Sequence, residues 1–80
     1  MDEEFDLIEQ FYYEAGNFVL FCTNIKTYQA MTEEKRKKLI EKMTIMVCKA
    51  FAPRRNYDIS KAEIREFVKV VIEYEVDRMQ

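Results

Sequence analysis

Apolar residues recur at helical spacing through residues 4–29, and this repeat constrains the fold more than any other feature of the sequence. Steps of three and four residues alternate along the segment, which is the spacing that places side chains on one face of an α-helix. The 80 residues contain one glycine and one proline, so few turns interrupt such a helix. The pattern predicts a helix over residues 4–29 whose main apolar face consists of Ile8, Phe11, Ala15, Phe18, Cys22 and Ile25.

Two further helices are predicted, over residues 33–51 and 61–78. Thr32 precedes the first of them and is followed by two acidic residues, which is typical of a helix N-terminus. Pro53 ends that helix, because the residue before a proline is driven out of helical geometry. Ser60 and Glu63 match a capping box at the start of the last helix, and the apolar spacing predicts that its core face consists of Ile64, Phe67, Val68, Val71 and Tyr74. The sequence therefore predicts an all-α, compact three-helix domain that spans residues 1–80 as a single unit.

An α+β alternative stays open at this point. Residues 17–25 and 69–76 are rich in β-branched and aromatic side chains, and part of the second segment alternates apolar and polar residues as a strand does. We favour helices, because Ser60 caps the second segment, no residue breaks it, and no other clear strand is available to pair with it. If both segments were strands, the fold would be α+β.

Charge is distributed unevenly along the chain, whose formal net charge is −2. Residues 1–25 carry six acids and no base, residues 26–55 carry nine bases and three acids, and residues 56–80 carry four bases and six acids. A basic middle between acidic ends either holds the helices together or presents a local positive field to a partner.

The residue types that most catalytic sites need are missing. The chain has no histidine, its single serine is assigned to a helix cap, and its single glycine cannot form a phosphate-binding loop. Cys22 and Cys48 lie in different predicted helices and have no histidine partner, so we interpret them as reduced core residues. We therefore expect no enzyme activity, no catalytic residue, no metal ion and no cofactor.

Two surfaces are candidates for binding. The first is a basic stripe on the second predicted helix, extended by the loop that follows it, and it consists of Lys35, Lys38, Lys42, Ile45, Lys49, Arg54, Arg55 and Tyr57. Such a stripe is either a hydrated face or a contact site for nucleic acid or an acidic protein. The second is surplus apolar surface that a small core has no room for, and it predicts self-association as a homodimer through Tyr13, Gly16, Leu20, Phe21, Ile72 and Val76.

These features favour a small non-enzymatic interaction module that binds and regulates or inhibits a macromolecular partner. A protein is the expected partner, and nucleic acid bound by the basic stripe and the arginine loop is the alternative. In size and composition the chain resembles the small regulators and host-factor inhibitors that phages and other mobile elements encode. The start MDEEFD is unlike a signal peptide and no apolar run is long enough to span a bilayer, so we expect a cytoplasmic (intracellular) protein with no membrane partner.

Overall fold

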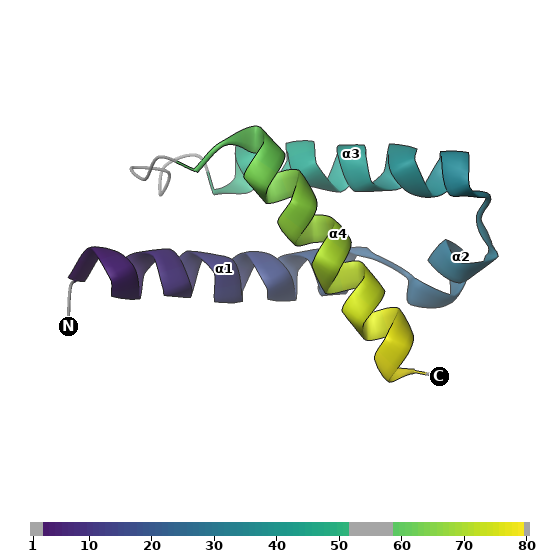
Figure 1. Ribbon diagram of the computed structural model, residues 1–80, viewed down its shortest axis with the longest axis horizontal. Coiled ribbons are helices and arrows are strands. Elements are labelled where there is room, and N and C mark those ends of the chain that lie inside the picture. The colour runs from purple at the N-terminus through teal and green to yellow at the C-terminus, as the bar shows by residue number, and fades with distance from the viewer. Residues whose placement is uncertain (1–2, 52–58, 80) are drawn as a thin grey trace.

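The computed structural model describes the backbone of residues 3–51 and 59–79, and within these ranges the side chains from Leu7 onward. Its elements are α1 (Glu3–Cys22), α2 (Ile25–Ala30), α3 (Glu33–Ala50) and α4 (Lys61–Arg78), as Figure 1 shows. No strand occurs in the described ranges, and both segments that the α+β alternative needed lie mostly or wholly within helices. The all-α prediction is confirmed, and the alternative is wrong.

The prediction of one helix over residues 4–29 is wrong at Thr23 and Asn24, where α1 ends and α2 begins. The backbone of Asn24 is extended, and its side-chain oxygen accepts a hydrogen bond from the Thr27 amide at 3.0 Å. Asparagine is a strong N-cap because its side chain satisfies an amide that the first helical turn leaves free. The break redirects the chain, and Tyr28, which the apolar repeat places outside the main face, is buried in the core.

The two predicted caps are confirmed. The Thr32 hydroxyl accepts a hydrogen bond from the Lys35 amide at 3.3 Å, and the Ser60 hydroxyl accepts one from the Glu63 amide at 3.1 Å. These side chains define where α3 and α4 begin. Pro53, the predicted end of the second helix, lies outside the described residues, and α3 ends at Ala50.

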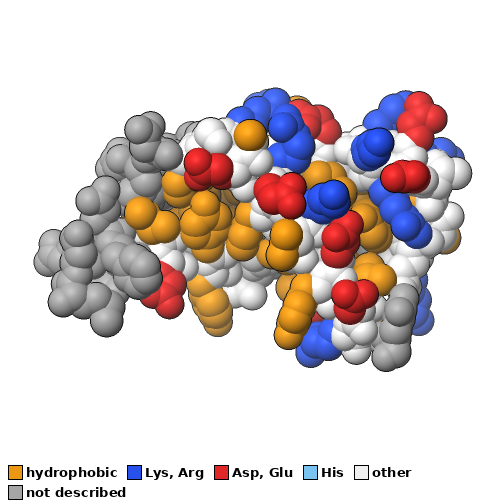
Figure 2. Space-filling view, viewed as in Figure 1, with side chains coloured by type: hydrophobic (Ala, Val, Ile, Leu, Met, Phe, Trp, Pro, Cys, Tyr) orange, Lys and Arg blue, Asp and Glu red, His pale blue; other side chains and the backbone are white. Residues whose placement is uncertain are grey.

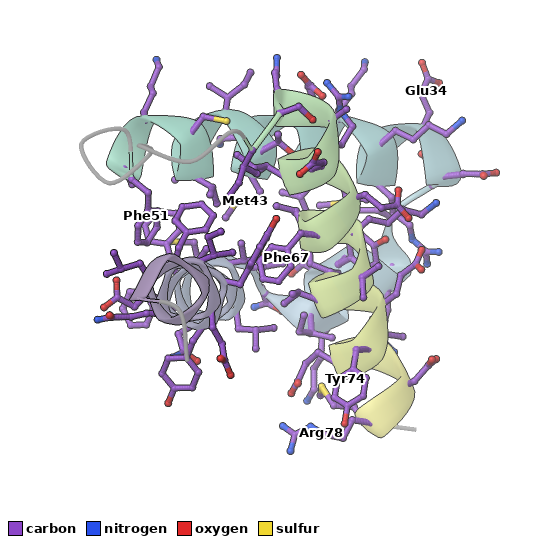
Figure 3. All side chains as sticks on the ribbon, turned by 60° about the vertical axis from the view of Figure 1, so that its left-hand side comes forward. Glu34, Met43, Phe51, Phe67, Tyr74 and Arg78 are labelled. Atoms are coloured by element: carbon purple, nitrogen blue, oxygen red, sulfur yellow. The ribbon has the colours of Figure 1, made fainter. Side chains whose placement is uncertain are left out.

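In Figure 1, α1 and α3 run in opposite directions, and α4 crosses them at a steep angle. α4 contacts each of the other three helices. In Figure 3, Met43 and Phe51 point from α3 toward the interior, where Phe51 meets Phe11 edge to face at 5.5 Å between ring centres. The buried hydrophobic core consists of Phe11, Ala15, Val19, Tyr28, Ile40, Met43, Val47, Ile59, Ile64, Val68 and Ile72.

The buried face of α4 differs from the predicted one. Ile64, Val68 and Ile72 follow one another at four-residue steps and are fully buried, whereas Tyr74 is 68% exposed. Assigning Tyr74 to the core and Ile72 to the surface was therefore wrong. Because α4 packs on three helices at once, its central row is buried, and the aromatic row beside it lies at the edge of the contact. Ile72 cannot belong to a self-association surface.

Candidate binding groove between α1 and α4

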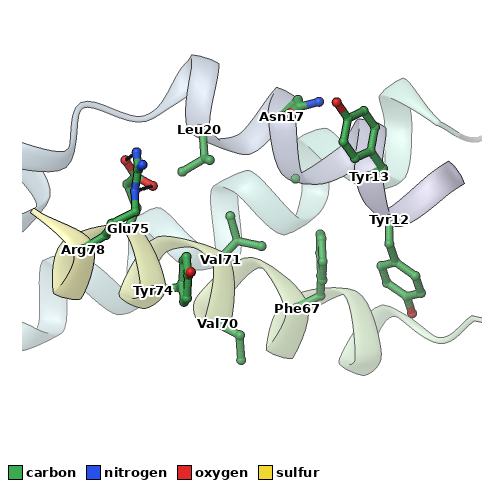
Figure 4. A pocket seen from close by; sticks show the side chains of 11 residues that line it. Tyr12, Tyr13, Asn17, Leu20, Phe67, Val70, Val71, Tyr74, Glu75 and Arg78 are labelled. Atoms are coloured by element: carbon green, nitrogen blue, oxygen red, sulfur yellow. Dashed lines mark hydrogen bonds and ion pairs between the residues drawn. The ribbon is translucent and has the colours of Figure 1, made fainter. Parts of the chain in front are cut away.

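An open apolar groove of about 570 Å³ lies between α1 and α4, and Figure 4 shows it from close by. Leu20 points from α1 toward α4, and Phe67 and Val71 point from α4 toward α1. This volume lies within the range of ligand-binding clefts, although the groove is open along its length. Its lining comprises Tyr12, Tyr13, Gly16, Asn17, Leu20, Phe67, Val70, Val71, Tyr74, Glu75 and Arg78.

Exposed apolar side chains form the walls of this groove. Tyr13 is 72% exposed, Val70 54% and Tyr74 68%, while Phe67 and Val71 are half-buried and pack against the core. Isolated exposed apolar residues are ordinary on protein surfaces, whereas several on facing walls of one groove form a patch. The α1–α4 groove thus brings together three of the seven large apolar side chains that are exposed among the described residues.

Gly16 lies on the floor of the groove, at the point where α1 and α4 are close. A β-carbon built on Gly16 would lie 3.5 Å from the Phe67 ring and 4.0 Å from the Val71 side chain, both ordinary contact distances. The sequence analysis assigns Gly16 to the self-association surface, where a glycine would let the backbone of a second copy approach closely. In the structure the neighbours of this position are side chains of the same chain, so α4 already occupies one side of it.

One end of the groove carries a charged pair. Arg78 donates hydrogen bonds to Glu75 at 2.7 and 3.2 Å, and Figure 4 shows the pair beside Leu20. At the other end, burial raises the pKa of the Tyr12 hydroxyl above its ordinary value, and the nearby carboxylate of Glu63 raises that pKa further. The Tyr12 end of the groove therefore lies near the negative charge of Glu63, whereas the positive charge of Arg78 at the other end is neutralised by Glu75.

The basic stripe is present on α3 as predicted. Lys35, Lys38, Lys42 and Lys49 are all exposed, and Ile45 is 39% exposed. None of the four ammonium groups forms an ion pair with another described residue. Arg54, Arg55 and Tyr57, the predicted extension of this stripe, lie outside the described residues.

Arg36, in the middle of the basic run, has a structural role. Its guanidinium donates to the carbonyl oxygens of Tyr28 at 3.0 Å and Gln29 at 2.6 Å, and it lies 5.1 Å from the centre of the Tyr28 ring. These contacts satisfy carbonyl groups at the C-terminal end of α2, where a cation is electrostatically favoured. Arg36 therefore fixes α2 to α3 and is not available to a partner.

The predicted self-association residues do not all lie on one surface of the structure. Tyr13, Gly16 and Leu20 line the groove. Phe21 is 91% exposed but lies outside the groove, and Val76 is half-buried and packs against the core. With Ile72 fully buried, three of the six predicted residues share one surface.

The α4 wall of the groove was missed by sequence analysis. Phe67, Val70, Val71 and Tyr74 occupy positions i, i+3, i+4 and i+7 of one helix, which is the spacing of a continuous apolar face. That signal was visible, but three of these residues were assigned to the core.

The described residues also carry acidic side chains and two cysteines. No group of three or more histidine, cysteine or acidic side chains within them is arranged to hold a metal ion. Cys22 is exposed and Cys48 half-buried, and both are free thiols, so the prediction that both lie in the core is wrong for Cys22. Among the described helices, none combines the length and the apolar character that crossing a bilayer requires.

Comparisons with known protein families, with curated proteins and with solved structures find no match to this chain.

Proposed function

We propose that this chain is a small non-enzymatic interaction module that binds a protein through the α1–α4 groove and thereby regulates or inhibits that protein. The observation that carries the proposal is the gathering of Tyr13, Val70 and Tyr74, all more than half exposed, on the walls of one groove. Apolar patches on monomers commonly mark interaction sites, and aromatic residues dominate binding energy at interfaces.

The size and composition of the chain indicate what kind of regulator it could be. They resemble those of the small regulators and host-factor inhibitors that phages and other mobile elements encode, and we propose the same kind of role, carried out in the cytoplasm. The predicted homodimer is a rival use of the same groove, since a second copy would also cover it.

The test compares two double variants with the wild-type chain. Val70→Ala with Tyr74→Ala removes apolar surface from the groove, and Lys38→Ala with Lys42→Ala is the control at exposed positions of α3 that do not line the groove. Each tagged chain is used to capture proteins from its native host, with quantitative mass spectrometry as the readout. We expect the groove variant to lose a protein that the wild type and the control retain. Equal recovery of that protein by all three chains would show that the groove is not the contact site.

Nucleic-acid binding by α3 is the second candidate, and the four exposed lysines without an ion-pair partner among the described residues favour it. If the stripe contacts phosphates, Lys38→Glu with Lys42→Glu weakens binding, and log affinity falls with log salt at a slope of about −0.9 per phosphate contact on duplex DNA. Absence of binding to duplex and single-stranded DNA and RNA at low salt would exclude this function.

A further inference from the structure

The shape of the α1–α4 groove suits a short helix. The lining spans Tyr12 to Leu20 on α1 and Phe67 to Arg78 on α4, which at 1.5 Å per residue is about 12 Å and about 16 Å. A helix with apolar anchors at positions i, i+4 and i+7 spans about 10 Å along its axis. Both walls are helices whose backbone groups bond within the helix, so they offer side chains to an occupant. An extended strand, which needs free backbone groups, gains little there.

Acidic side chains border the α4 wall of the groove. α1 carries no basic residue, and its described side chains include two acids, Glu9 and Glu14. On α4, Glu63 and Asp77 share a row with Val70 at seven-residue steps, so they border the apolar wall at both ends. Both are exposed, and neither forms an ion pair with a described residue. Acidic side chains recur along α4 on the face shown in Figure 2.

The basic residues of α4 do not neutralise this border. Lys61 and Arg65 bind Glu41 of α3, at 2.9 and 2.7 Å, on the other side of the helix. Arg78 is the basic residue in the groove lining, and it pairs with Glu75. Lys69, the remaining basic residue of α4, lines a different pocket together with Tyr28 and Arg36. Glu63 and Asp77 therefore have no ion-pair partner among the described residues.

We infer that the groove accepts a basic amphipathic helix of another protein, with apolar anchors on one face and lysine or arginine flanking them. The inference rests on the proposed function of the groove and names its partner class by charge complementarity. Acidic side chains beside an apolar groove favour a basic occupant and disfavour an acidic one.

A second copy of the chain fits the groove less well. Two grooves that face each other would bring both acidic borders together, and like charges in contact are unfavourable. The basic α3 of a second copy would have the right charge, but Ile45 is its one exposed large apolar residue. A helix with a single anchor leaves most of the apolar wall uncovered. Charge and anchors together thus favour a different protein as the occupant.

The test uses the full chain and three fluorescent helical peptides of equal length. The first has leucine or phenylalanine at i, i+4 and i+7 with flanking lysines, the second replaces those lysines with glutamates, and the third keeps the lysines but replaces the anchors with alanines. Binding is measured by fluorescence anisotropy up to millimolar protein, at low and at high salt. We expect the first peptide to bind at least tenfold more tightly than either of the others. Its affinity falls with added salt, whereas that of the glutamate peptide rises.

Charge-reversed chains sharpen the test. In Glu63→Lys with Asp77→Lys, the preference between the lysine and glutamate peptides should shrink or reverse. The matched control is Glu33→Lys with Glu34→Lys, which reverses the same number of charges at exposed positions in the first turn of α3, and it should keep the wild-type preference. Circular dichroism verifies that each chain is folded. If the double variant does not fold, the salt dependence of the wild-type chain still decides the outcome.

Each result has a distinct meaning. Equal affinity for the lysine and glutamate peptides would overturn the inference and leave the groove as a neutral binding site. Failure of both anchored peptides to bind would count against the proposed function of the groove as well. A dimer in light scattering that dissociates when Val70 and Tyr74 are replaced by alanine would identify the second copy as the occupant and overturn the inference.

Discussion

Replacing Gly16 with alanine should stabilise the protein, which is unusual for a glycine at a helix contact. Gly16 lies inside α1, where glycine is the least favourable residue apart from proline. The added methyl group would lie 3.5 Å from Phe67 and 4.0 Å from Val71, so it meets side chains at ordinary contact distance and displaces nothing. The substitution therefore gains helix propensity without a packing cost.

The size of the gain follows from measured propensities. Alanine is more favourable than glycine by about 0.8 to 1 kcal/mol in a helix interior. For a domain of this length, about 1 kcal/mol of unfolding free energy raises the melting temperature by about 4 to 8 °C. Contact of the new methyl group with Phe67 adds a small further gain.

Thermal and urea unfolding followed by circular dichroism measure the effect. Asn17→Ala is the matched control, because it changes the next residue of α1 to alanine at an exposed position and should gain about 0.5 kcal/mol from propensity alone. A lower melting temperature for Gly16→Ala, together with a gain for Asn17→Ala, would refute the described floor of the groove. It would mean that Gly16 packs more tightly against Phe67 and Val71 than the distances of 3.5 and 4.0 Å indicate.

Three further predictions concern the rest of the fold. Ile72→Ala should lower the unfolding free energy by about 2 to 5 kcal/mol, because the Ile72 side chain is fully buried. Tyr74→Ala should lower it by less than about 1 kcal/mol, because Tyr74 is mostly exposed. Urea titration measures both changes, and equal losses would contradict the assignment of Ile72 to the buried face of α4. Hydrogen bonds and charge from Arg65 and Lys61 hold the pKa of Glu41 at about 2, below its ordinary value of 4.5. Its carboxylate therefore stabilises the fold above pH 4.5, and that contribution is lost as the pH falls toward 2. Glu41→Gln should accordingly be less stable than the wild type at neutral pH and equal to it near pH 2, and a difference independent of pH would argue against the ion pair. Thr23→Val should raise the unfolding free energy by about 1 kcal/mol, because the buried Thr23 hydroxyl has no hydrogen-bond partner among the described residues. Thr44→Val loses a 2.7 Å hydrogen bond to the Ile40 carbonyl and should bring no such gain, and an equal gain for both variants would contradict this difference in hydrogen bonding.

Helix starts were predictable because a cap is a local interaction. Thr32 and Ser60 each bond an amide three residues along, and the residues involved are adjacent in sequence. Asn24 is a cap of the same kind, but the apolar repeat continues through Ile25 and concealed it. A periodic pattern indicates which residues share a face of a helix. It does not reveal a break such as the one at Thr23 and Asn24, because apolar residues continue at helical spacing on both sides of it.

The buried face of α4 was not predictable from local sequence. Ile72 and Tyr74 are both apolar and lie two positions apart, and which of them is buried depends on how α4 crosses α1 and α3. Crossing angles arise from packing between helices distant in sequence. The same limit explains the partial success at the site, where Tyr13, Gly16 and Leu20 were identified as one surface but Phe67, Val71 and Tyr74 of α4 were assigned to the core.

The acidic border of the groove was also beyond local analysis. Glu63 was interpreted as part of a capping box, and its place beside Tyr12 follows only from the packing of α4 on α1. The basic stripe, in contrast, lies on a single helix, and its exposure could be inferred from the spacing of its lysines alone.

Chemical-shift mapping tests most directly whether the α1–α4 groove is the partner-binding surface. An isotope-labelled chain is titrated with the lysine-flanked amphipathic peptide, and amide shifts are followed in two-dimensional NMR spectra. We expect the shifts to gather on the two walls, around Tyr13 and Leu20 on α1 and around Val70 and Tyr74 on α4. Shifts centred on Lys38 and Lys42 of α3, with the groove residues unchanged, would contradict this expectation.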